Sequence, residues 1–302
     1  MTDIAVLSSA YVENDVLKIA AIAEKGSEHP LAQAVLKKAS EMKILLQEGK
    51  SYQAITGKGI KATYKNKLIL VGNRLLMKEH KIPIDDAESK IQKLENEGKT
   101  VVIVSFDKKI IGLMAIADTL KEFSKEAVSE LEKMGKEVWM ITGDNQRTAN
   151  AVAQQLGISN VMAEVLPQDK AKKVRELQEK GKIVAAVGDG INDAPMLAQA
   201  DVGIAVGAGT DIAKETGGIV LIKNDLRDVV TAIDLSRKTV AKMKQNLFWA
   251  FFYNVALIPV AAGALYPFGI MLNPIFAAIA MASSSISVVG NAMLLNRYKP
   301  RI

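Results

Sequence analysis

Val184-Ala-Ala-Val-Gly-Asp-Gly-Ile-Asn-Asp-Ala-Pro195 is the stretch around which we expect the rest of the chain to be organised. An apolar run ends at Gly188 and is followed by Asp189, Asn192 and Asp193. A strand buried on both faces of a parallel sheet has this continuous apolar character. Open α/β sheets bind ligands beyond the carboxyl ends of their strands, so we expect these polar side chains to line a site.

The oxygen-rich side chains of this turn suit a hard cation. Mg²⁺ prefers one or two carboxylates together with substrate phosphate, so Asp189 and Asp193 are predicted Mg²⁺ ligands. A surface turn rich in Asp and Asn is the alternative explanation. Two carboxylates and a carboxamide directly after an apolar strand favour the binding site.

This stretch resembles the hinge motif of P-type ATPases, which have the haloacid dehalogenase-like fold, and the resemblance extends along nearly the whole chain. It points to the heavy-metal-exporting subclass, most closely the Cu⁺ exporters. The fold class that the resemblance implies is α/β. A haloacid dehalogenase-like, doubly wound parallel sheet would form the phosphorylation domain, with an inserted α+β nucleotide-binding domain and a C-terminal two-helix transmembrane hairpin.

The family phosphorylates an aspartate in an Asp-Lys-Thr-Gly-Thr motif a few residues upstream of the position that matches the start of this sequence. No Asp-Lys-Thr occurs in the 302 residues. We therefore expect these residues alone to bind ATP weakly and to be unable to autophosphorylate.

Composition sets broad bounds on the function. The length of 302 residues suits about two domains. The absence of cysteine excludes disulfides and thiolate metal sites within these residues. The net charge is +6, but the lysines are scattered along helical segments with few aromatics among them, so we expect no nucleic-acid partner. The stretch Met1–Ala5 has no signal-peptide character.

Four segments are expected. Alternating strand and helix patterns after residue 112 predict the parallel sheet. An amphipathic helix is expected from Asp118 to Met134, with Phe123, Ala127, Val128 and Leu131 on one side, and a short helix from Thr210 to Thr216. The expected limits are residues 1–9 for a remnant of the phosphorylation domain, 10–112 for the nucleotide-binding domain, 113–234 for the phosphorylation domain with the hinge, and 235–302 for a linker helix and two transmembrane helices.

The segment Glu24-Lys-Gly-Ser-Glu-His-Pro30 lies between two predicted helices. Pro30 suits the first turn of the second helix, which places His29 at a helix N-terminus. From the residues alone, a capped turn with an incidental histidine is the favoured explanation. Gly57-Lys-Gly59 allows close backbone approach to a flat ligand, although such a pair is common in hairpins.

The tetrapeptide Ser-Glu-His-Pro resembles the adenine-binding signature of heavy-metal ATPases. In contrast, His80 lies in Lys-Glu-His-Lys and is expected at the surface. By this resemblance the base and ribose of ATP are surrounded by Glu24, His29, Gly57, Gly59 and Asn73.

Two further segments suit a phosphoryl group. Thr142-Gly-Asp-Asn145 leaves a predicted strand at a helix N-terminus, where backbone donors and a hydroxyl face a ligand. Lys170 lies in the first turn of a helix that begins at Pro167, where the helix dipole disfavours a cation. It is either a tolerated surface lysine or the partner of a phosphate, as the resemblance implies. The predicted catalytic residues are Thr142, Gly143, Asp144, Lys170, Asn192 and Asp193.

The C-terminal part has membrane character. No acidic, basic or histidine residue occurs from Gln245 to Asn296, a run long enough for two membrane helices of about 20 residues each. Tyr266-Pro-Phe-Gly269 interrupts it, and basic residues flank both ends. Positive flanks place both ends in the cytoplasm. We expect a multi-pass protein of the cell membrane with cytoplasmic catalytic domains; a buried hairpin in a soluble core is the alternative.

Polar side chains within this run are candidates for the transported ion. A methionine thioether is a soft ligand that favours Cu⁺, and hydroxyl and amide groups add oxygen donors. Serines also pack transmembrane helices against each other, which is the alternative explanation. The run resembles the paired transport-site motifs of Cu⁺ exporters at Tyr253, Asn254, Met281 and Ser285. These residues do not separate Cu⁺ from Ag⁺, and Met281 makes a Zn²⁺ or K⁺ exporter the weaker interpretation.

The predicted function is therefore the ATP-binding and Mg²⁺-binding part of a P-type ATPase that couples ATP hydrolysis to Cu⁺ export. The expected partners are ATP, Cu⁺ with a copper chaperone as a candidate donor, membrane lipid and the N-terminal portion of the ATPase. A nucleotide-binding assembly subunit that complements a separate N-terminal half is the alternative. A phosphatase with a membrane tail is disfavoured because it leaves Ser27–Pro30 unexplained.

Overall fold

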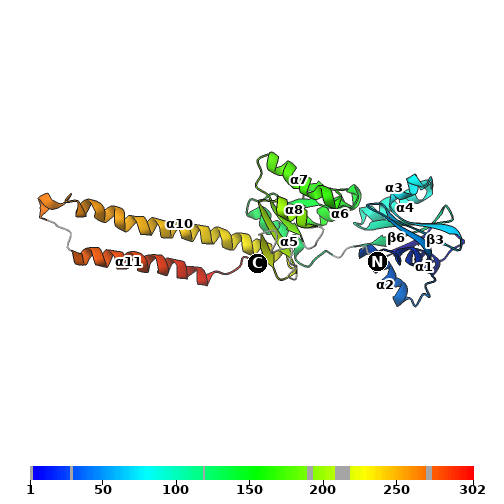
Figure 1. Ribbon diagram of the computed structural model, residues 1–302, viewed down its shortest axis with the longest axis horizontal. Helices are drawn as coiled ribbons and strands as arrows, with labels where there is room; N and C mark the ends of the chain where they lie inside the picture. The colour runs from blue at the N-terminus through cyan, green and yellow to red at the C-terminus, as the bar shows by residue number, and fades with distance from the viewer. Residues whose placement is uncertain (1–2, 28–29, 118–119, 189–192, 208–217, 270–273) are drawn as a thin grey trace. The chain divides into compact units, whose positions relative to one another are not determined.

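The structure is a computed structural model that describes residues 3–27, 30–117, 120–188, 193–207, 218–269 and 274–302. The side chains of residues 30, 274, 276 and 277 are also outside the description. The chain divides into two compact units, Met1–Ala205 with Thr210–Ile219, and Val206–Gly209 with Val220–Ile302. Each unit is described by itself (Figure 1).

The N-terminal half of the first unit is built on a six-stranded antiparallel sheet with the strand order β1-β6-β5-β4-β3-β2. Its tight turns at Lys65-Asn66 and Asp107-Lys108 have positive φ at both residues, the geometry that matches the twist of paired strands. The strands are β1 (Asp3–Val6), β2 (Lys50–Ile55), β3 (Gly59–Tyr64), β4 (Lys67–Gly72), β5 (Thr100–Phe106) and β6 (Lys109–Ile116).

Helices cover both faces of this sheet because successive strand residues point to opposite sides. Ile69, Val71 and Val102 pack with α1 and α2 in one core, whereas Leu70, Val101 and Ile103 pack with α3 and α4 in another. Figure 1 shows these two pairs of helices on either side of the strands. The helices are α1 (Glu13–Glu24), α2 (Pro30–Glu41), α3 (Arg74–Glu79) and α4 (Asp85–Asn96).

The first strand, β1, lies within residues 1–9, which we expect to be a remnant of the phosphorylation domain. Asp3–Val6 pairs with Gly112–Ala115 and forms the edge of the six-stranded sheet. Ile4 and Val6 pack against the core that α1 and α2 cover. These contacts make β1 part of the same sheet as β2 to β6. The expected domain limits stay predictions.

The second half of the first unit has the expected parallel pairs. β7 (Trp139–Ile141) pairs with β8 (Asn160–Met162), and β9 (Ala185–Gly188) pairs with β10 (Val202–Val206). β11 (Ile219–Leu221) completes the order β11-β10-β9. The described strands thus form two ladders. The accompanying helices are α5 (Ser124–Lys133), α6 (Gln146–Leu156), α7 (Pro167–Glu179) and α8 (Ala194–Gln199), and a further helix expected at 210–216 lies outside the described residues.

The start of α5 was predicted too early. The pattern favoured a helix from Asp118 with Phe123 on its apolar face, but α5 begins at Ser124. Phe123 has a φ of 64° and is 39% exposed. A left-handed residue of this size does not belong in a helix, so Phe123 marks the boundary instead.

The second unit is a helical hairpin. α10 (Arg227–Ala261) is one continuous helix of 35 residues, so the expected linker helix and first apolar helix are joined. The single turn η2 (Tyr266–Phe268) follows at the predicted interruption, and α11 (Pro274–Met293) runs back beside α10 into η3 (Leu294–Arg297) (Figure 1).

Among the described residues, one helix is long and apolar enough to cross a membrane, Ala278–Arg297, with a mean hydropathy of 1.6. The expected second span, in the C-terminal part of α10, does not meet that test. The hairpin is confirmed, and its crossing the membrane twice stays a prediction.

Candidate functional site

The structure brings Lys170 and Asp193 together at the end of β9. The Nζ atom of Lys170 donates to Oδ1 of Asp193 at 2.8 Å, and both side chains are mostly buried. Leu166 and Pro167 begin α7 there, and Asp193 immediately precedes α8. The carboxylate offsets the cost of holding a cation near a helix N-terminus. Lys170 is therefore an ion-paired and partly buried lysine, and its contact with a phosphate stays a prediction.

Gly188 makes room for this pair. A Cβ atom at Gly188 would lie 2.7 Å from Cβ and 2.9 Å from Oδ2 of Asp193. A larger residue would push Asp193 away from the strand end, which explains why the apolar run must stop at glycine. Asp189 and Asn192, which the sequence placed in this site, lie outside the described residues.

The Thr142-Gly-Asp-Asn145 turn forms a small hydrogen-bonded group after β7. The Thr142 hydroxyl donates to Oδ2 of Asp144 at 2.8 Å and accepts from the Asp144 amide at 3.1 Å. The Thr100 hydroxyl donates to the other oxygen, Oδ1, at 2.8 Å. Gly143 is exposed between them. Both Asp144 oxygens are thus occupied, and a phosphate at Thr142 would have to replace the bond to Asp144.

Asn145 occupies the donors at the start of α6. Its side chain accepts from the amides of Arg147 and Thr148 at 3.1 and 3.0 Å, which is a helix N-cap. These amides are therefore not free to bind a phosphate. The remaining phosphate-binding group of this turn is the Thr142 hydroxyl with the exposed backbone of Gly143.

On the nucleotide side, Asn73 joins Gly57 to the start of α3. Its Nδ2 donates to the Gly57 carbonyl at 2.8 Å, while its Oδ1 caps α3 by accepting from the Leu76 amide at 3.2 Å. The Asn73 amide donates to the Lys58 carbonyl at 2.8 Å. Both ends of the side chain hold backbone, so Asn73 shapes the Gly57 loop.

Gly59 and Gly72 allow the backbones of the paired strands β3 and β4 to approach each other closely. A Cβ atom on Gly59 would lie 2.1 Å from the Val71 carbonyl oxygen, and one on Gly72 would lie 2.1 Å from that of Lys58. The sequence interpretation selected Gly59 and missed Gly72, although Gly72 directly precedes Asn73. The structure brings Gly57 and Asn73 into contact and pairs Gly59 with Gly72 between β3 and β4.

Glu24 lies at the buried end of α1, and 8% of it is exposed. Burial raises the pKa of its carboxyl to about 7, while the side chain of Ser27 opposes the shift. Next to it, Gly26 lies against the ring of Tyr52, since a Cβ on Gly26 would be 2.7 Å from that ring. Tyr52 is a neighbour that the sequence interpretation missed. His29, between α1 and α2, lies outside the described residues.

The predicted transport residues are not brought together. The Tyr253 hydroxyl lies 3.1 Å from the hydroxyl of Ser287, a residue outside the predicted set, and joins α10 to α11. Asn254 donates to the Ala250 carbonyl of its own helix at 2.8 Å. Met281 is 74% exposed, and Ser285 is exposed as well. The described part of the chain also holds no group of three His, Cys, Asp or Glu suited to a metal.

The chain was compared with known proteins. The family model for haloacid dehalogenase-like hydrolases matches residues 4–201. The chain is 54% identical over 292 residues to the probable copper-exporting P-type ATPase of Archaeoglobus fulgidus. The aligned region covers 96% of this chain and 36% of that protein. The corresponding values for the copper-exporting P-type ATPase of Bacillus subtilis are 47%, 96% and 35%. The chain therefore spans about a third of the length of these relatives.

Solved structures give the same picture. A zinc-transporting PIB-type ATPase in the E2.Pi state matches with a TM-score of 0.68 and 35% identity, over 97% of this chain and 46% of that one. The catalytic domain of the CPx-ATPase CopB-B, described in relation to nucleotide binding, matches with a TM-score of 0.53 and 25% identity, over 74% of this chain and 78% of that domain.

Proposed function

The chain belongs to the haloacid dehalogenase-like hydrolases and is homologous to heavy-metal P-type ATPases over nearly its whole length, and from this premise we propose that it is the ATP- and Mg²⁺-binding part of a Cu⁺ exporter. Its relatives are copper-exporting P-type ATPases.

In the proposed nucleotide site, the backbone at Gly57 and Gly59 receives the flat base of ATP. Asn73 holds the Gly57 loop in place by donating a hydrogen bond to the Gly57 carbonyl. Glu24 contributes a buried carboxyl whose raised pKa favours the neutral, proton-donating form near neutral pH. His29 is proposed to stack on or hydrogen-bond to the base, as the Ser-Glu-His-Pro signature implies.

At the phosphoryl end, Lys170 and the Thr142 hydroxyl are proposed to hold phosphate oxygens, with Gly143, Asp144, Asn192 and Asp193 completing the polar site. The ion pair orients the Lys170 side chain until a phosphate arrives. Carboxylates at the end of a parallel strand fit Mg²⁺, and Asp189 and Asp193 would hold it. When bound, Mg²⁺ neutralises the charge on the transferred phosphoryl group.

The phosphorylated aspartate would come from outside the 302 residues, because they contain no Asp-Lys-Thr. Another part of the same ATPase would supply it. A separately encoded half is the second candidate source, and co-purification of a polypeptide with Asp-Lys-Thr-Gly-Thr would favour it.

Cu⁺ is proposed as the transported ion, held within the membrane by Tyr253, Asn254, Met281 and Ser285. The hairpin would lie in the cell membrane with both of its ends on the cytoplasmic side. The ATP-binding domains would also lie in the cytoplasm. A copper chaperone is the proposed donor of the ion. Because the four residues do not converge in the structure, this site would need the other membrane helices of the pump to complete it.

The observation that carries the proposal is the buried Lys170–Asp193 pair at the end of β9, within a chain 54% identical to a copper-exporting ATPase. A chimaera tests it. The chain would replace the matching third of the Archaeoglobus fulgidus protein, and Cu⁺-stimulated ATP hydrolysis would be measured. We expect stimulation that Met281→Ala removes and Met293→Ala, an exposed methionine of the same helix, preserves. A folded chimaera with no response to Cu⁺ would reject the proposal.

A further inference from the structure

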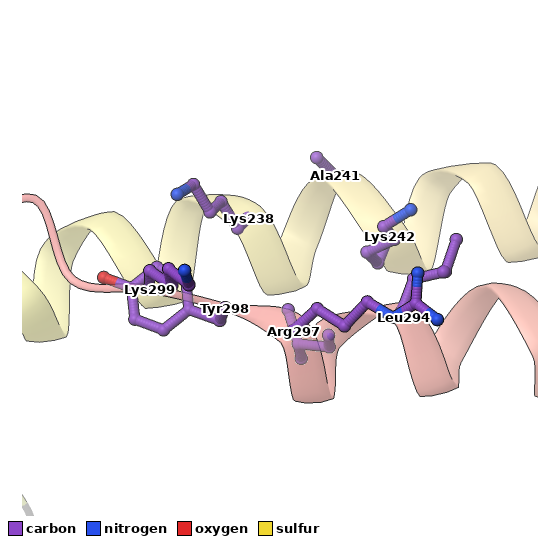
Figure 2. A pocket seen from close by; sticks show the side chains of 8 residues that line it. Lys238, Ala241, Lys242, Leu294, Arg297, Tyr298 and Lys299 are labelled. Atoms are coloured by element: carbon purple, nitrogen blue, oxygen red, sulfur yellow. The ribbon is translucent and has the colours of Figure 1, made fainter.

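A basic groove lies at the foot of the helical hairpin, between α10 and the segment that follows α11. Its volume is about 450 Å³. Figure 2 shows lysines from α10 facing the groove opposite side chains of the tail after α11. The lining residues are Lys238, Ala241, Lys242, Leu294, Leu295, Arg297, Tyr298 and Lys299.

The groove carries an excess of positive charge. Four of its eight lining residues are cations, and none of the eight is acidic. Lys238 pairs with Asp234 at 3.0 Å, but Arg301 shares that carboxylate at 3.2 Å. Lys242 donates to the neutral amide oxygen of Asn291 at 2.8 Å. These contacts leave the groove net positive, so an anion is the ligand that its charge favours.

The groove also has an apolar side. Ala241, Leu294, Leu295 and the ring of Tyr298 line it together with the cations. The candidate span Ala278–Arg297 ends here, so in the proposed membrane placement the groove would lie where hydrocarbon meets water. A soluble anion would use only the charges, whereas a ligand with a phosphate and an apolar stem would use both surfaces.

A buried contact holds the tail that forms one wall. Asp234, 2% exposed, pairs with Arg301 across the base of the hairpin. Tyr298 places its ring 4.5 Å from the Nζ atom of Lys238, a cation–π contact, and its hydroxyl 3.5 Å from the Thr231 carbonyl. The tail is therefore fixed against α10, and the groove is preformed.

We propose that this groove binds the phosphate headgroup of an anionic phospholipid, in the cytoplasmic leaflet of the membrane. The inference rests on the proposed membrane placement of the hairpin. Arg297 and Lys299 would contact the phosphate from the tail, and Lys238 and Lys242 from α10. Leu294 and Leu295 would contact the glycerol and the first carbons of the acyl chains.

The test uses the full 302-residue chain purified in detergent. Short-chain phosphatidylglycerol and phosphatidylcholine are titrated separately, and retained lipid is measured by native mass spectrometry. The groove variant is Arg297→Gln with Lys299→Gln. The matched control is Arg237→Gln with Lys244→Gln, which removes two exposed charges from the same end of α10 outside the lining. Arg297→Lys with Lys299→Arg keeps the charge and tests for rescue.

We expect the wild type to retain phosphatidylglycerol over phosphatidylcholine, and the groove variant to bind it roughly tenfold or more weakly. The control and rescue variants should stay within about threefold of the wild type, since the groove keeps its charge. Equal retention by groove and control variants would overturn the proposal. So would displacement of phosphatidylglycerol by inorganic phosphate, which would indicate a site for free anions.

An ATP titration of the same samples separates this inference from the proposed function. A chain that binds ATP but shows no preference for phosphatidylglycerol would reject the lipid site alone. A chain that retains phosphatidylglycerol in the groove but does not bind ATP would reject the proposed function alone.

Discussion

Glu24 lies in the interior of the nucleotide-binding half as an ionisable group without a cation beside it in any described contact. Burial raises the pKa of its carboxyl to about 7 from 4.5. Between these two values the folded chain keeps a proton that the unfolded chain releases. The free energy of unfolding therefore falls as pH rises through this window, and the loss is complete above about pH 7.

Glu24→Gln should remove this pH dependence. The neutral amide carries no proton to lose, so the variant gains up to about 3 kcal/mol relative to the wild type between about pH 5 and about pH 8. Thermal unfolding across that range measures it. Glu13→Gln, an exposed change at the start of the same helix, is the control. Parallel curves for Glu24→Gln and the wild type would show that Glu24 is already ionised at low pH.

A substitution at Gly59 tests whether the proposed nucleotide site depends on the close approach of β3 and β4. Gly59→Ala should destabilise the domain by more than about 2 kcal/mol, because the new Cβ would lie 2.1 Å from the Val71 carbonyl oxygen. Gly135→Ala is the matched control: its φ is also positive, but nothing lies within 4 Å of the added Cβ. The control should cost about 1 kcal/mol. Equal losses of thermal stability would mean that backbone strain, and not the clash, decides.

Single residues were predictable to different degrees. The chemical types at Lys170 and Asp193 follow from their positions next to predicted strand and helix ends. Their ion pair spans 23 residues of sequence and depends on how α7 and β9 pack, which no local pattern contains. The same limit explains why Gly72 and Tyr52 were missed, since their contacts are formed only when strands and loops meet.

At the scale of elements, Arg74 joins α3 to α4. It donates from Nη1 and Nη2 to the two carboxylate oxygens of the buried Glu95, at 2.5 and 2.9 Å, and from Nε and Nη2 to Glu88 at 3.0 Å. The side chain of Glu95 is 2% exposed. Such a two-pronged pair fixes the angle between the helices as well as their distance.

Arg74→Leu should destabilise the nucleotide-binding domain by about 3 kcal/mol, because it removes both short bonds to a buried carboxylate. Adding Glu95→Leu should restore most of the loss, since the pair is then replaced by apolar contact. Thermal unfolding of the single and double variants gives the coupling energy. Lys93→Leu, an exposed change on α4, is the control. A double variant less stable than Arg74→Leu would contradict this account.

Helix boundaries could be predicted from the sequence where capping residues mark them. α6 runs from Gln146 to Leu156 with Gly157 as its left-handed cap, and α7 begins at Pro167, as their cap residues indicate. The predicted start of α5 was wrong because Phe123 has a left-handed backbone, which its residue type does not indicate. The pairing of β1 with β6 could not be predicted because the two strands lie more than 100 residues apart in the sequence.

At the scale of the whole molecule, the 302 residues contain the groups that would bind ATP and lack a phosphorylatable Asp-Lys-Thr. The purified chain incubated with γ-labelled ATP and Mg²⁺ should therefore form no acid-stable phosphoenzyme. Labelling should appear only after a polypeptide that carries Asp-Lys-Thr-Gly-Thr is added. Acid-stable label on the chain alone would contradict the account and point to another nucleophile.

The broad architecture was largely predictable because it rests on long patterns. The apolar run after Gln245 predicted the hairpin, and strand–helix alternation predicted the parallel pairs around β9. The arrangement of the predicted transport residues could not be predicted from the sequence. Tyr253 bonds to Ser287, and the Met281 side chain is exposed. Neighbouring helices outside these residues would decide where those side chains point.

ATP titration by calorimetry is the most direct test of the central claim, that this chain binds ATP through the segment between α1 and α2. The wild type would be compared with His29→Gln and with His80→Gln, a change of the other histidine, whose ring contacts the Leu76 carbonyl in α3. We predict that His29→Gln binds ATP at least about tenfold more weakly, because it loses one hydrogen bond or stacking contact to the base. His80→Gln should bind ATP as the wild type does. Equal affinity of all three proteins would contradict the account and place the nucleotide elsewhere.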